Sequence, residues 1–428
     1  MKMQEKRRPE QALQINILDF GAVSGGVVDC TKAIAAAILE AGKSGGEVYV
    51  PSGTYLTGAL FLRSHVGLYL EKGAVLLGIP EDRAYPLLLS RVAGIEMRWP
   101  AGLVNVRGAE DVTIRGEGTI DGQGAYWWEK YWGKDRRGGM RARYDAQGLR
   151  WAVDYDCRRV RNILVYNSKK VRIEGICSKR SGFWNLHICY CNEVLVRGVT
   201  ICENDGPSTD GIDIDSSRGV AVQNCTISCN DDNICVKAGR DADGLRVNRP
   251  CEDVQIENCT VLAGEGITLG SETSGGMRNI LIRNNVFRGT KNGLRMKSCR
   301  TRGGLIEAVT AEGLKMENVG SPFNFQLDWY PAYNQCEIPP GYTGRVPAHW
   351  HTLLQPVAAA QGLPRARDIQ VRRVEVSTRG TALFDIYGLP ELPIEDLRFE
   401  DVKARAAETG RIANVRGLRL DGLQIDLC

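Results

Sequence analysis

The sequence predicts an all-β fold, a single-stranded right-handed parallel β-helix with a capping helix near its N-terminus. The first observation is a repeated pattern, apolar-x-apolar-x-polar-apolar, which is usually followed by a second β-rich run. Such alternation gives each run one buried and one exposed face. The second observation is spacing, because the copies at 194, 220, 254 and 280 start 26, 34 and 26 residues apart. Periods of this length indicate stacked supersecondary units, and the absence of helical patterns between the runs argues against leucine-rich and βα repeats.

Each copy of the pattern consists of two short runs joined by a polar bend, often Asn or Gly. The copies span 112–120, 171–176, 194–201, 220–227, 254–261, 280–287, 369–376, 397–404 and 418–425. Neighbouring coils would stack about 4.8 Å apart and bury their apolar faces against each other, so we predict one domain over residues 1–428. Val199, Cys225 and Cys259 share one repeat position and predict a ladder of small apolar side chains inside.

A solenoid must cover its end, and residues 29–46, "DCTKAIAAAILEAGKSGG", predict the covering helix. Asp29 is a plausible N-cap, and a Gly-rich stop follows. One helical face is apolar, formed by Ile34, Ala37, Ile38 and Ala41. We assign this helix as the cap within an N-terminal capping region, residues 1–60.

Two stretches interrupt the repeat, residues 122–151 and 327–356. Both are rich in Trp and Tyr, and the first also carries several Arg residues. Long insertions in a compact fold are usually functional loops, so we expect them to wall a cleft across the coils at 194–297. The alternative is packing against the outside of the solenoid.

Composition excludes several classes of protein. The 428 residues carry a net charge of +4 with 25% charged residues, an ordinary soluble composition with no sign of a nucleic-acid partner. No apolar run approaches the ~20 residues of a membrane span. The N-terminus has no apolar segment, so we expect a cytoplasmic protein, or a secreted or periplasmic one if a signal has been removed. The sequence makes no prediction of oligomeric state.

Cysteine and histidine usage indicates neither a disulfide framework nor a metal. The 14 Cys lie mostly in apolar stretches, which favours buried free thiols and a reducing compartment. The four His residues form no cluster at zinc spacing. We therefore expect no metal and no cofactor.

Carboxylates gather in "STDGIDIDSS" (208–217) and "NDDNICVKAG" (230–239). Asp210 and Asp231 are 21 residues apart, about one coil, so Asp210 should stand beside Asp231 and Asp232. Close carboxylates raise each other's pKa, and one can stay protonated near neutral pH. Inverting glycoside hydrolysis needs such an acid and a base about 6.5–9.5 Å away. The alternative is two ordinary turns, since both sequences are common in turns.

The following coils carry Glu265, between two glycines, and Arg295 and Lys297, two residues apart on one strand face. Two cations beside a carboxylate patch suit a ligand that carries its own carboxylate. Taken singly, these residues also fit a solvated strand face.

Four ordered motifs resemble those of the polygalacturonases, pectin-cleaving enzymes of glycoside hydrolase family 28. The family pattern is Asn-Thr-Asp, Gln/Asn-Asp-Asp, Gly-His-Gly and Arg-Ile-Lys, and here the motifs read 208–210, 230–232, 264–266 and 295–297. Stretches within 16–201 also resemble this superfamily, whose fold is the pectin-lyase-like solenoid. The resemblance implies that Asp231 is the general acid and that Asp210 and Asp232 activate water. It also implies that Arg295 and Lys297 hold the substrate carboxylate on the leaving-group side, and that inversion needs no metal.

The sequence departs from the family pattern at Ser208, Met296 and Glu265. Glu265 stands where the family has His, so it either raises the pKa of Asp231 further or binds a sugar hydroxyl; His187 is a candidate replacement contact. The expected function is inverting, exo-acting hydrolysis of α-linked galacturonides in pectic oligo- or polysaccharides. Three alternatives stay open: a hydrolase of rhamnogalacturonan or another pectic side chain, a non-catalytic carbohydrate-binding β-helix, and a calcium-dependent pectate lyase.

Overall fold

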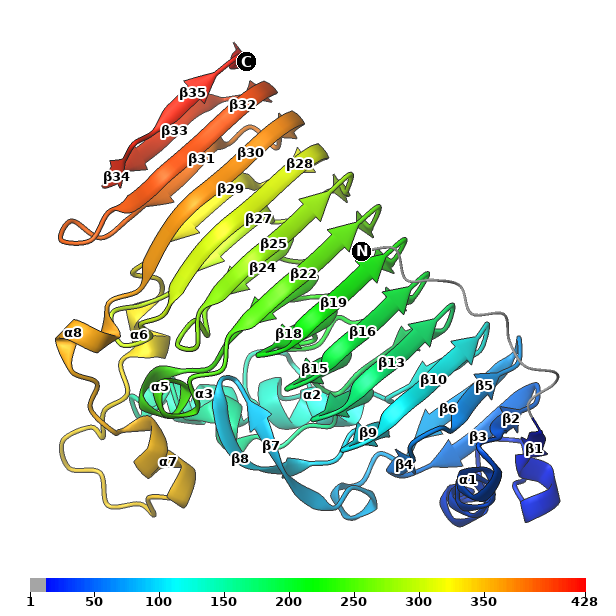
Figure 1. The fold of residues 1–428 in the computed structure, drawn as a ribbon. Coiled ribbons are helices and arrows are strands. Elements are labelled where there is room, and N and C mark those ends of the chain that lie inside the picture. Colours follow the sequence, from blue (N-terminus) through cyan, green and yellow to red (C-terminus); the bar gives the residue numbers. More distant parts are fainter. Residues whose placement is uncertain (1–12) are drawn as a thin grey trace.

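The computed structural model describes residues 13–428 and shows a right-handed parallel β-helix (Figure 1). Within these residues, the strands form an 11-stranded and a 23-stranded parallel sheet. A typical coil contributes one strand to the smaller sheet and, after bends, two strands to the larger one. The predicted fold class is confirmed.

The strands of the smaller sheet follow one another coil by coil. They are β4 (Leu60–Leu62), β9 (Val104–Arg107), β12 (Ile163–Tyr166), β15 (Leu186–Cys189), β18 (Ile212–Asp215), β21 (Ile234–Lys237), β24 (Ile267–Gly270), β27 (Asn292–Lys297), β29 (Ser321–Gln326), β31 (Ala382–Tyr387) and β33 (Glu408–Ala413). The larger sheet contains β1 (Gln14–Asn16), β2 (Glu47–Val50), β3 (Gly53–Thr57), β5 (Gly67–Leu70), β6 (Ala74–Gly78), β10 (Glu110–Gly116), β11 (Thr119–Asp121), β13 (Lys169–Glu174), β14 (Cys177–Lys179), β16 (Asn192–Arg197), β17 (Thr200–Cys202), β19 (Arg218–Gln223), β20 (Thr226–Ile227), β22 (Cys251–Glu257), β23 (Thr260–Val261), β25 (Met277–Arg283), β26 (Val286–Arg288), β28 (Leu305–Val319), β30 (Arg365–Thr378), β32 (Ile394–Ala406), β34 (Val415–Arg416), β35 (Arg419–Asp421) and β36 (Gln424–Leu427).

The predicted two-run repeats are the strands of the larger sheet. The bend between the two runs of a coil is a single residue in the left-handed region, with φ of +64° at Gly198 and +55° at Asn224. Gly and Asn are the residues that adopt this conformation at least cost, which explains their recurrence there. The third strand of each coil, in the smaller sheet, was not predicted.

The interior is apolar and carries the predicted ladder. Val199, Cys225 and Cys259 are each 1% exposed in one column of stacked coils. All cysteines of residues 13–428 are free thiols, and most are buried. Stacking of successive coils therefore buries one continuous core.

The N-terminal end is covered by α1 (Thr31–Ser44), whose buried face is the predicted set Ile34, Ala37, Ile38 and Ala41 (Figure 1). The N-cap residue is Cys30 rather than Asp29, although Oδ1 of Asp29 still accepts a hydrogen bond from the Thr31 N–H over 2.9 Å. Part of the predicted capping region already forms β2 and β3. No helix of residues 13–428 has the length and apolar character needed to cross a bilayer.

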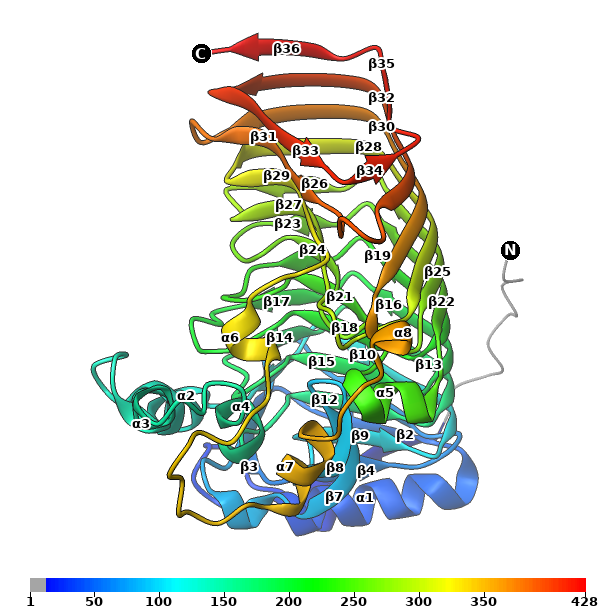
Figure 2. The same cartoon turned by 90° about the vertical axis from the view of Figure 1, so that its left-hand side faces the viewer.

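The two insertions meet on one side of the solenoid (Figure 2). The rings of Trp151 and Trp350 lie 4.9 Å apart, and the Trp151 indole donates to the Glu337 carbonyl over 2.9 Å. Short helices occur in and next to these insertions where irregular loops were expected. The remaining helices of the described residues are η1 (Ile17–Phe20), η2 (Asp82–Ala84), α2 (Ala125–Trp132), α3 (Gly139–Ala146), α4 (Val153–Asp156), α5 (Asp241–Val247), α6 (Pro331–Asn334), α7 (Ala348–Leu353) and α8 (Ala359–Gly362).

A third excursion was not predicted. β7 (Leu87–Val92) and β8 (Ile95–Pro100) form an antiparallel hairpin that leaves the solenoid. Figure 1 shows it on the same side as α5 and α7. The hairpin therefore joins the insertions in covering one face of the coils.

Candidate active site

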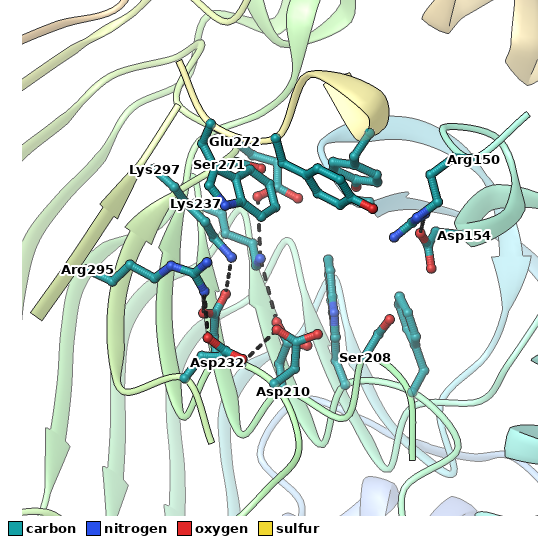
Figure 3. A pocket seen from close by; sticks show the side chains of 18 residues that line it. Arg150, Asp154, Ser208, Asp210, Asp232, Lys237, Ser271, Glu272, Arg295 and Lys297 are labelled. Carbon is teal, nitrogen blue, oxygen red and sulfur yellow. Dashed lines mark hydrogen bonds and ion pairs between the residues drawn. The ribbon is translucent and has the colours of Figure 1, made fainter. Parts of the chain in front are cut away.

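A cavity of about 260 Å³ lies where the insertions cover the coils of the smaller sheet (Figure 3). This volume is close to the lower end of the range of small-molecule sites, about 300–1,000 Å³. Its floor includes Asp210, Asp231, Asp232 and Lys237, and the first insertion contributes Arg150 to its walls. The aromatic side chains of the walls are Trp329, Tyr330 and Tyr333 of the second insertion, together with Phe183 and Trp184. Residues of both insertions therefore line this cavity.

Parallel stacking places the predicted site residues side by side. The Gly211 N–H donates to the Asp232 carbonyl over 2.9 Å, and the Glu265 N–H donates to the Asp231 carbonyl over 2.9 Å. These bonds fix Asp210, Asp232 and Glu265 on three successive coils, just before β18, β21 and β24. Arg295 and Lys297 project from β27, the next strand. The side chains of Asp210, Asp232, Glu265, Arg295 and Lys297, together with that of Asp231, line the same cavity.

The acidic cluster is tighter than predicted. One carboxylate oxygen from each of Asp210, Asp231 and Asp232 lies within 4.8 Å of the others, less than the expected 6.5–9.5 Å. The reason is that in-register coils bring equivalent side chains to about the strand spacing. A water that donates to two oxygens at about 2.8 Å and a near-tetrahedral angle holds them about 4.6 Å apart. The cluster therefore has the dimensions to hold one water between two carboxylates.

Asp232 is held as a carboxylate. Lys297 Nζ donates to its Oδ2 over 2.8 Å, the Thr268 hydroxyl donates to Oδ1 over 2.6 Å, and Nη1 of Arg295 lies 3.6 Å away. Burial opposes ionisation, but Lys297 and Arg295 outweigh it and lower the pKa of Asp232. Asp232 is thus a fixed negative charge in the floor.

Asp231 behaves in the opposite way. Burial, followed by the neighbouring charge of Asp232, raises its pKa to about 6. Glu265 contributes in the same direction, while Lys297 opposes the shift. The pKa values of Asp231 and Asp232, which are adjacent in sequence, are therefore shifted in opposite directions. This difference allows one carboxyl group to donate a proton while the other stays an anion.

Lys237, which was not predicted from the sequence, forms ion pairs with three carboxyl groups. Its Nζ lies 3.7 Å from Asp210, 3.5 Å from Asp213 and 3.4 Å from Glu272. Burial and then Asp213 and Asp231 raise the pKa of Asp210, and Lys237 opposes this. Because a base works best when its pKa is not far below the ambient pH, Asp210 is a stronger base than Asp232 whenever it is ionised.

Glu265 is fully engaged with basic and amide groups. It accepts hydrogen bonds from Arg295 over 3.0 Å, Lys291 over 2.8 Å and Asn292 over 2.7 Å. It therefore neutralises part of the charge that Arg295 would offer a ligand.

His187 does not take the place predicted for it as a substrate contact. Its side chain is 0% exposed, and it does not line the cavity. Nε2 lies 3.5 Å from Asp215, and the ring packs against Trp184. Burial lowers the pKa of His187 to about 4, so the imidazole is a neutral group beneath the cavity floor.

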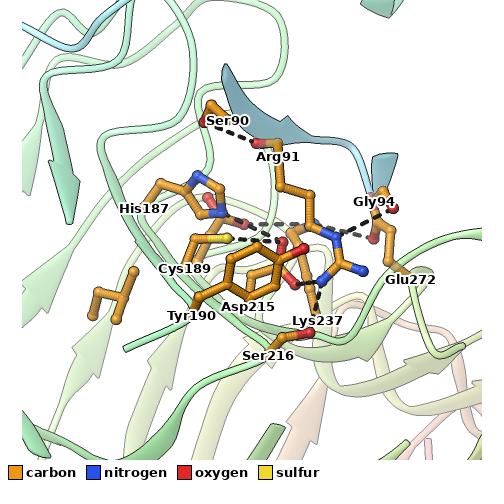
Figure 4. A network of polar contacts seen from close by, with 12 residues as sticks. Ser90, Arg91, Gly94, His187, Cys189, Tyr190, Asp215, Ser216, Lys237 and Glu272 are labelled. Atoms are coloured by element: carbon orange, nitrogen blue, oxygen red, sulfur yellow. Dashed lines mark hydrogen bonds and ion pairs between the residues drawn. The ribbon is translucent and has the colours of Figure 1, made fainter. Parts of the chain in front are cut away.

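Asp215 is also the anchor of the β7–β8 hairpin (Figure 4). Nη1 of Arg91 donates to Asp215 over 3.0 Å and to the Ser216 hydroxyl over 2.6 Å, and both charged side chains are 0% exposed. The hairpin tip follows Arg91, and Ala93 of that tip lines the cavity. This buried ion pair thus fixes one wall of the site to its floor.

The walls add aromatic rings over the cations. Trp329 covers Arg295 and Lys297 at 5.5 and 4.8 Å, and Trp184 covers Lys237 at 4.9 Å. Arg150 and Asp154 also line the cavity and were not singled out from the sequence. The signal for Lys237 was available, because "ICVK" (234–237) is a short alternating strand that begins two residues after Asp232.

Two groups have the geometry of a cation site within residues 13–428: Asp210–Asp231–Asp232 and His187–Cys189–Asp215. In both, protein cations already offset the carboxylates: Lys237, Lys297 and Arg295 in the first, and Arg91 in the second. The first cluster therefore has its countercharge within the chain, which suits proton transfer.

Fold and site together define a parallel β-helix protein whose cavity gathers carboxylates and basic side chains on successive coils. The profile of glycosyl hydrolases family 28 matches residues 96–346, more than half of the chain, and this protein belongs to that family. Residues 14–80 match a second profile, described as rhamnogalacturonase A/epimerase, pectate lyase-like. The family resemblance predicted from the four motifs is confirmed.

Relatives share both sequence and fold. A probable polygalacturonase of Vitis vinifera is 31% identical over 72% of this chain and 62% of its own length. An exo-poly-alpha-D-galacturonosidase of Dickeya chrysanthemi is 26% identical over 71% of this chain and 55% of its own length. The chain thus spans about three fifths of the length of these curated relatives. The structure of an exopolygalacturonase from Thermotoga maritima superposes with a TM-score of 0.77 and 25% identity, over 98% of this chain and 94% of that one.

Proposed function

We propose that this protein is an exo-acting hydrolase that cleaves α-linked galacturonides of pectin with inversion at the anomeric carbon. The observation that carries the proposal is the pairing of Asp231, whose pKa is raised to about 6, with Asp232, whose pKa is lowered, beside Asp210. Family membership and the names of the relatives support it.

The reaction follows from these assignments. Asp231 donates its proton to the glycosidic oxygen as the bond from that oxygen to C1 breaks. A water held between Asp210 and Asp232 attacks C1 from the opposite face and gives a proton to Asp210. Asp232 stays ionised and stabilises the positive charge that develops on the sugar. The products are a sugar with a new C1 hydroxyl and a leaving unit with a free hydroxyl, so one water is consumed.

Arg295 and Lys297 would hold the carboxylate of the leaving galacturonate. Both side chains line the cavity beside Asp232 under the ring of Trp329. Arg150 of the first insertion packs against Tyr330 and Tyr333 of the second at the other end of the cavity, which supports attack on a chain end rather than in mid-chain.

Product analysis over time on polygalacturonate tests the proposal. Monomer as the sole early product supports exo action, whereas early mixed oligomers contradict it. Asp231→Asn should slow the release of reducing ends about 10²- to 10⁴-fold while binding of oligogalacturonides survives. Proton NMR of the first product on a short galacturonide reads the anomer, and a retained α-anomer would contradict inversion.

A second candidate is hydrolysis of rhamnogalacturonan or another pectic side chain. The ion pair between Glu265 and Arg295 favours it, because it reduces the charge available to a galacturonate in the leaving position. The N-terminal profile match adds little, since every cavity-lining residue lies beyond residue 80. Parallel assays on defined galacturonan and rhamnogalacturonan oligosaccharides decide between the two.

A further inference from the structure

The positive charge in the cavity is not distributed as the family motifs alone suggest. At one end, Arg295 and Lys297 face Asp232 and Glu265, two cations against two carboxylates. Glu265 also forms an ion pair with the exposed Lys291. The leaving-group end of the cavity is therefore close to balanced before any substrate binds.

The opposite end carries an excess of positive charge. Asp154 is the one carboxylate between two arginines, with Nη1 of Arg150 at 2.7 Å from Oδ2 and Nη2 of Arg159 at 3.2 Å from Oδ1. Burial opposes ionisation of Asp154, but the two arginines outweigh it and lower its pKa. Two cations against one carboxylate leave an uncompensated positive charge.

That charge is presented by Arg150 and not by Arg159. Arg159 is 0% exposed, donates to the Pro207 carbonyl and lies against the rings of Tyr131 and Phe183. Arg150 lines the cavity, and within residues 13–428 only its Nη1 makes a hydrogen bond. Its Nε is buried without a partner among those residues.

Arg150 is held in a fixed orientation. Its guanidinium lies 5.0 Å from the ring centre of Tyr333 and 5.9 Å from that of Tyr330. Figure 3 shows Arg150 and Asp154 across the cavity from Arg295 and Lys297, with Asp210 and Asp232 between them. An oriented guanidinium with free N–H groups is suited to a carboxylate.

We propose that Arg150 binds the carboxylate of the terminal galacturonate, the unit that is released, and so selects a uronate over a neutral hexose there. This assignment rests on the proposed function, because it identifies the Arg150 end with the sugar whose C1 is attacked. The first insertion then acts as a specificity element as well as a wall.

The test uses two disaccharides that share a galacturonate leaving unit. One is digalacturonate, and the other carries an α-linked galactose in place of its terminal galacturonate. Wild-type protein should prefer digalacturonate in kcat/KM, and Arg150→Gln should reduce that preference about 10- to 100-fold, the contribution of a charged hydrogen bond. Arg150→Lys should retain an intermediate preference. The ratio of two rates in one preparation is independent of the folded fraction.

Arg295→Gln is the matched control, because it should slow both disaccharides by a similar factor and leave the preference unchanged. A preference that survives in Arg150→Gln would overturn the assignment of Arg150 while the proposed function stands. Wild-type protein that cleaves neither disaccharide would overturn the proposed function itself.

Discussion

Nη1 of Arg295 donates a hydrogen bond to Oε2 of Glu265 over 3.0 Å, so a cation that the family motif assigns to substrate is already paired. Arg295 lies on β27 and Glu265 lies just before β24, the neighbouring strand of the smaller sheet, so stacking of coils brings the two side chains together. A ligand carboxylate must compete with Glu265 for this guanidinium. The departure at residue 265 thus changes the charge that Arg295 offers to a ligand.

Glu265→His should therefore raise kcat/KM on oligogalacturonides by about 5- to 30-fold, because it frees a charged donor for the substrate. Initial rates on trigalacturonate measure the effect. Glu257→His is a matched control, since Glu257 also bridges two coils to an arginine, Arg283, but lies outside the cavity. Equal rates for Glu265→His and wild type would show that the substrate does not use Arg295.

Activity should fall as pH rises through about 6, because the donating form of Asp231 is lost above its raised pKa. Glu265→Gln removes a negative neighbour that raises this pKa, so the falling limb should move to lower pH. Asp231→Asn should cost about 10²- to 10⁴-fold, the usual contribution of a general acid. The pH dependence of kcat gives the position of the falling limb in wild type and in Glu265→Gln. A limb that does not move in Glu265→Gln would exclude coupling between the carboxyl groups of Asp231 and Glu265.

Much of the fold was predictable because a solenoid repeats its local rules. A six-residue alternation, a bend that needs Gly or Asn, and a regular period specify each coil without information from distant sequence. The third strand was missed because segments such as 212–215 are four residues long and contain aspartates. Their burial depends on partners such as Lys237 on the next coil, and a strand pattern alone does not contain that information.

The candidate site was predictable where it lies on the repeat. Asp210, Asp231, Asp232, Arg295 and Lys297 follow from coil spacing and family motifs. Arg150 lies in the first insertion, and the β7–β8 hairpin also leaves the solenoid. The repeat does not predict where such segments pack against the coils. The prediction for His187 failed because its strand, β15, pairs with β18 of the site, yet the side chain is buried and does not line the cavity.

Lys237→Met should lower kcat about 100-fold with a smaller change in KM. Lys237 is the cation that pairs with Asp210, Asp213 and Glu272, and no other cation of residues 13–428 lies within 4 Å of these carboxylates. Its removal raises the pKa of Asp210 further, so the base is ionised only at higher pH and the rising limb of the kcat profile should move upward.

The position of this limb distinguishes an electrostatic role of Lys237 from a merely structural one. A misfolded fraction lowers kcat at every pH without moving the limb. Lys179→Met, at a pair with the exposed Glu203, should leave both kcat and the profile unchanged. An unmoved limb in Lys237→Met would contradict the assignment of Asp210 as the base.

Arg91→Met should destabilise the fold by about 3–5 kcal/mol at pH 7, because it leaves the carboxylate of Asp215 buried and unpaired. Although burial opposes ionisation, Arg91 and a contact with His187 lower the pKa of Asp215 to about 2, against about 3.9 in an unfolded chain. A depressed pKa contributes stability above the unfolded value that is lost as pH falls from about 4 towards 2.

The difference in unfolding free energy between Arg91→Met and wild type should therefore shrink at low pH. Urea unfolding at pH 7 and pH 3 measures it, with Arg278→Met at an exposed pair as the control. Arg91→Met/Asp215→Asn should recover part of the loss, and an equal loss in the double variant would show that lost packing, not the unpaired charge, sets the cost.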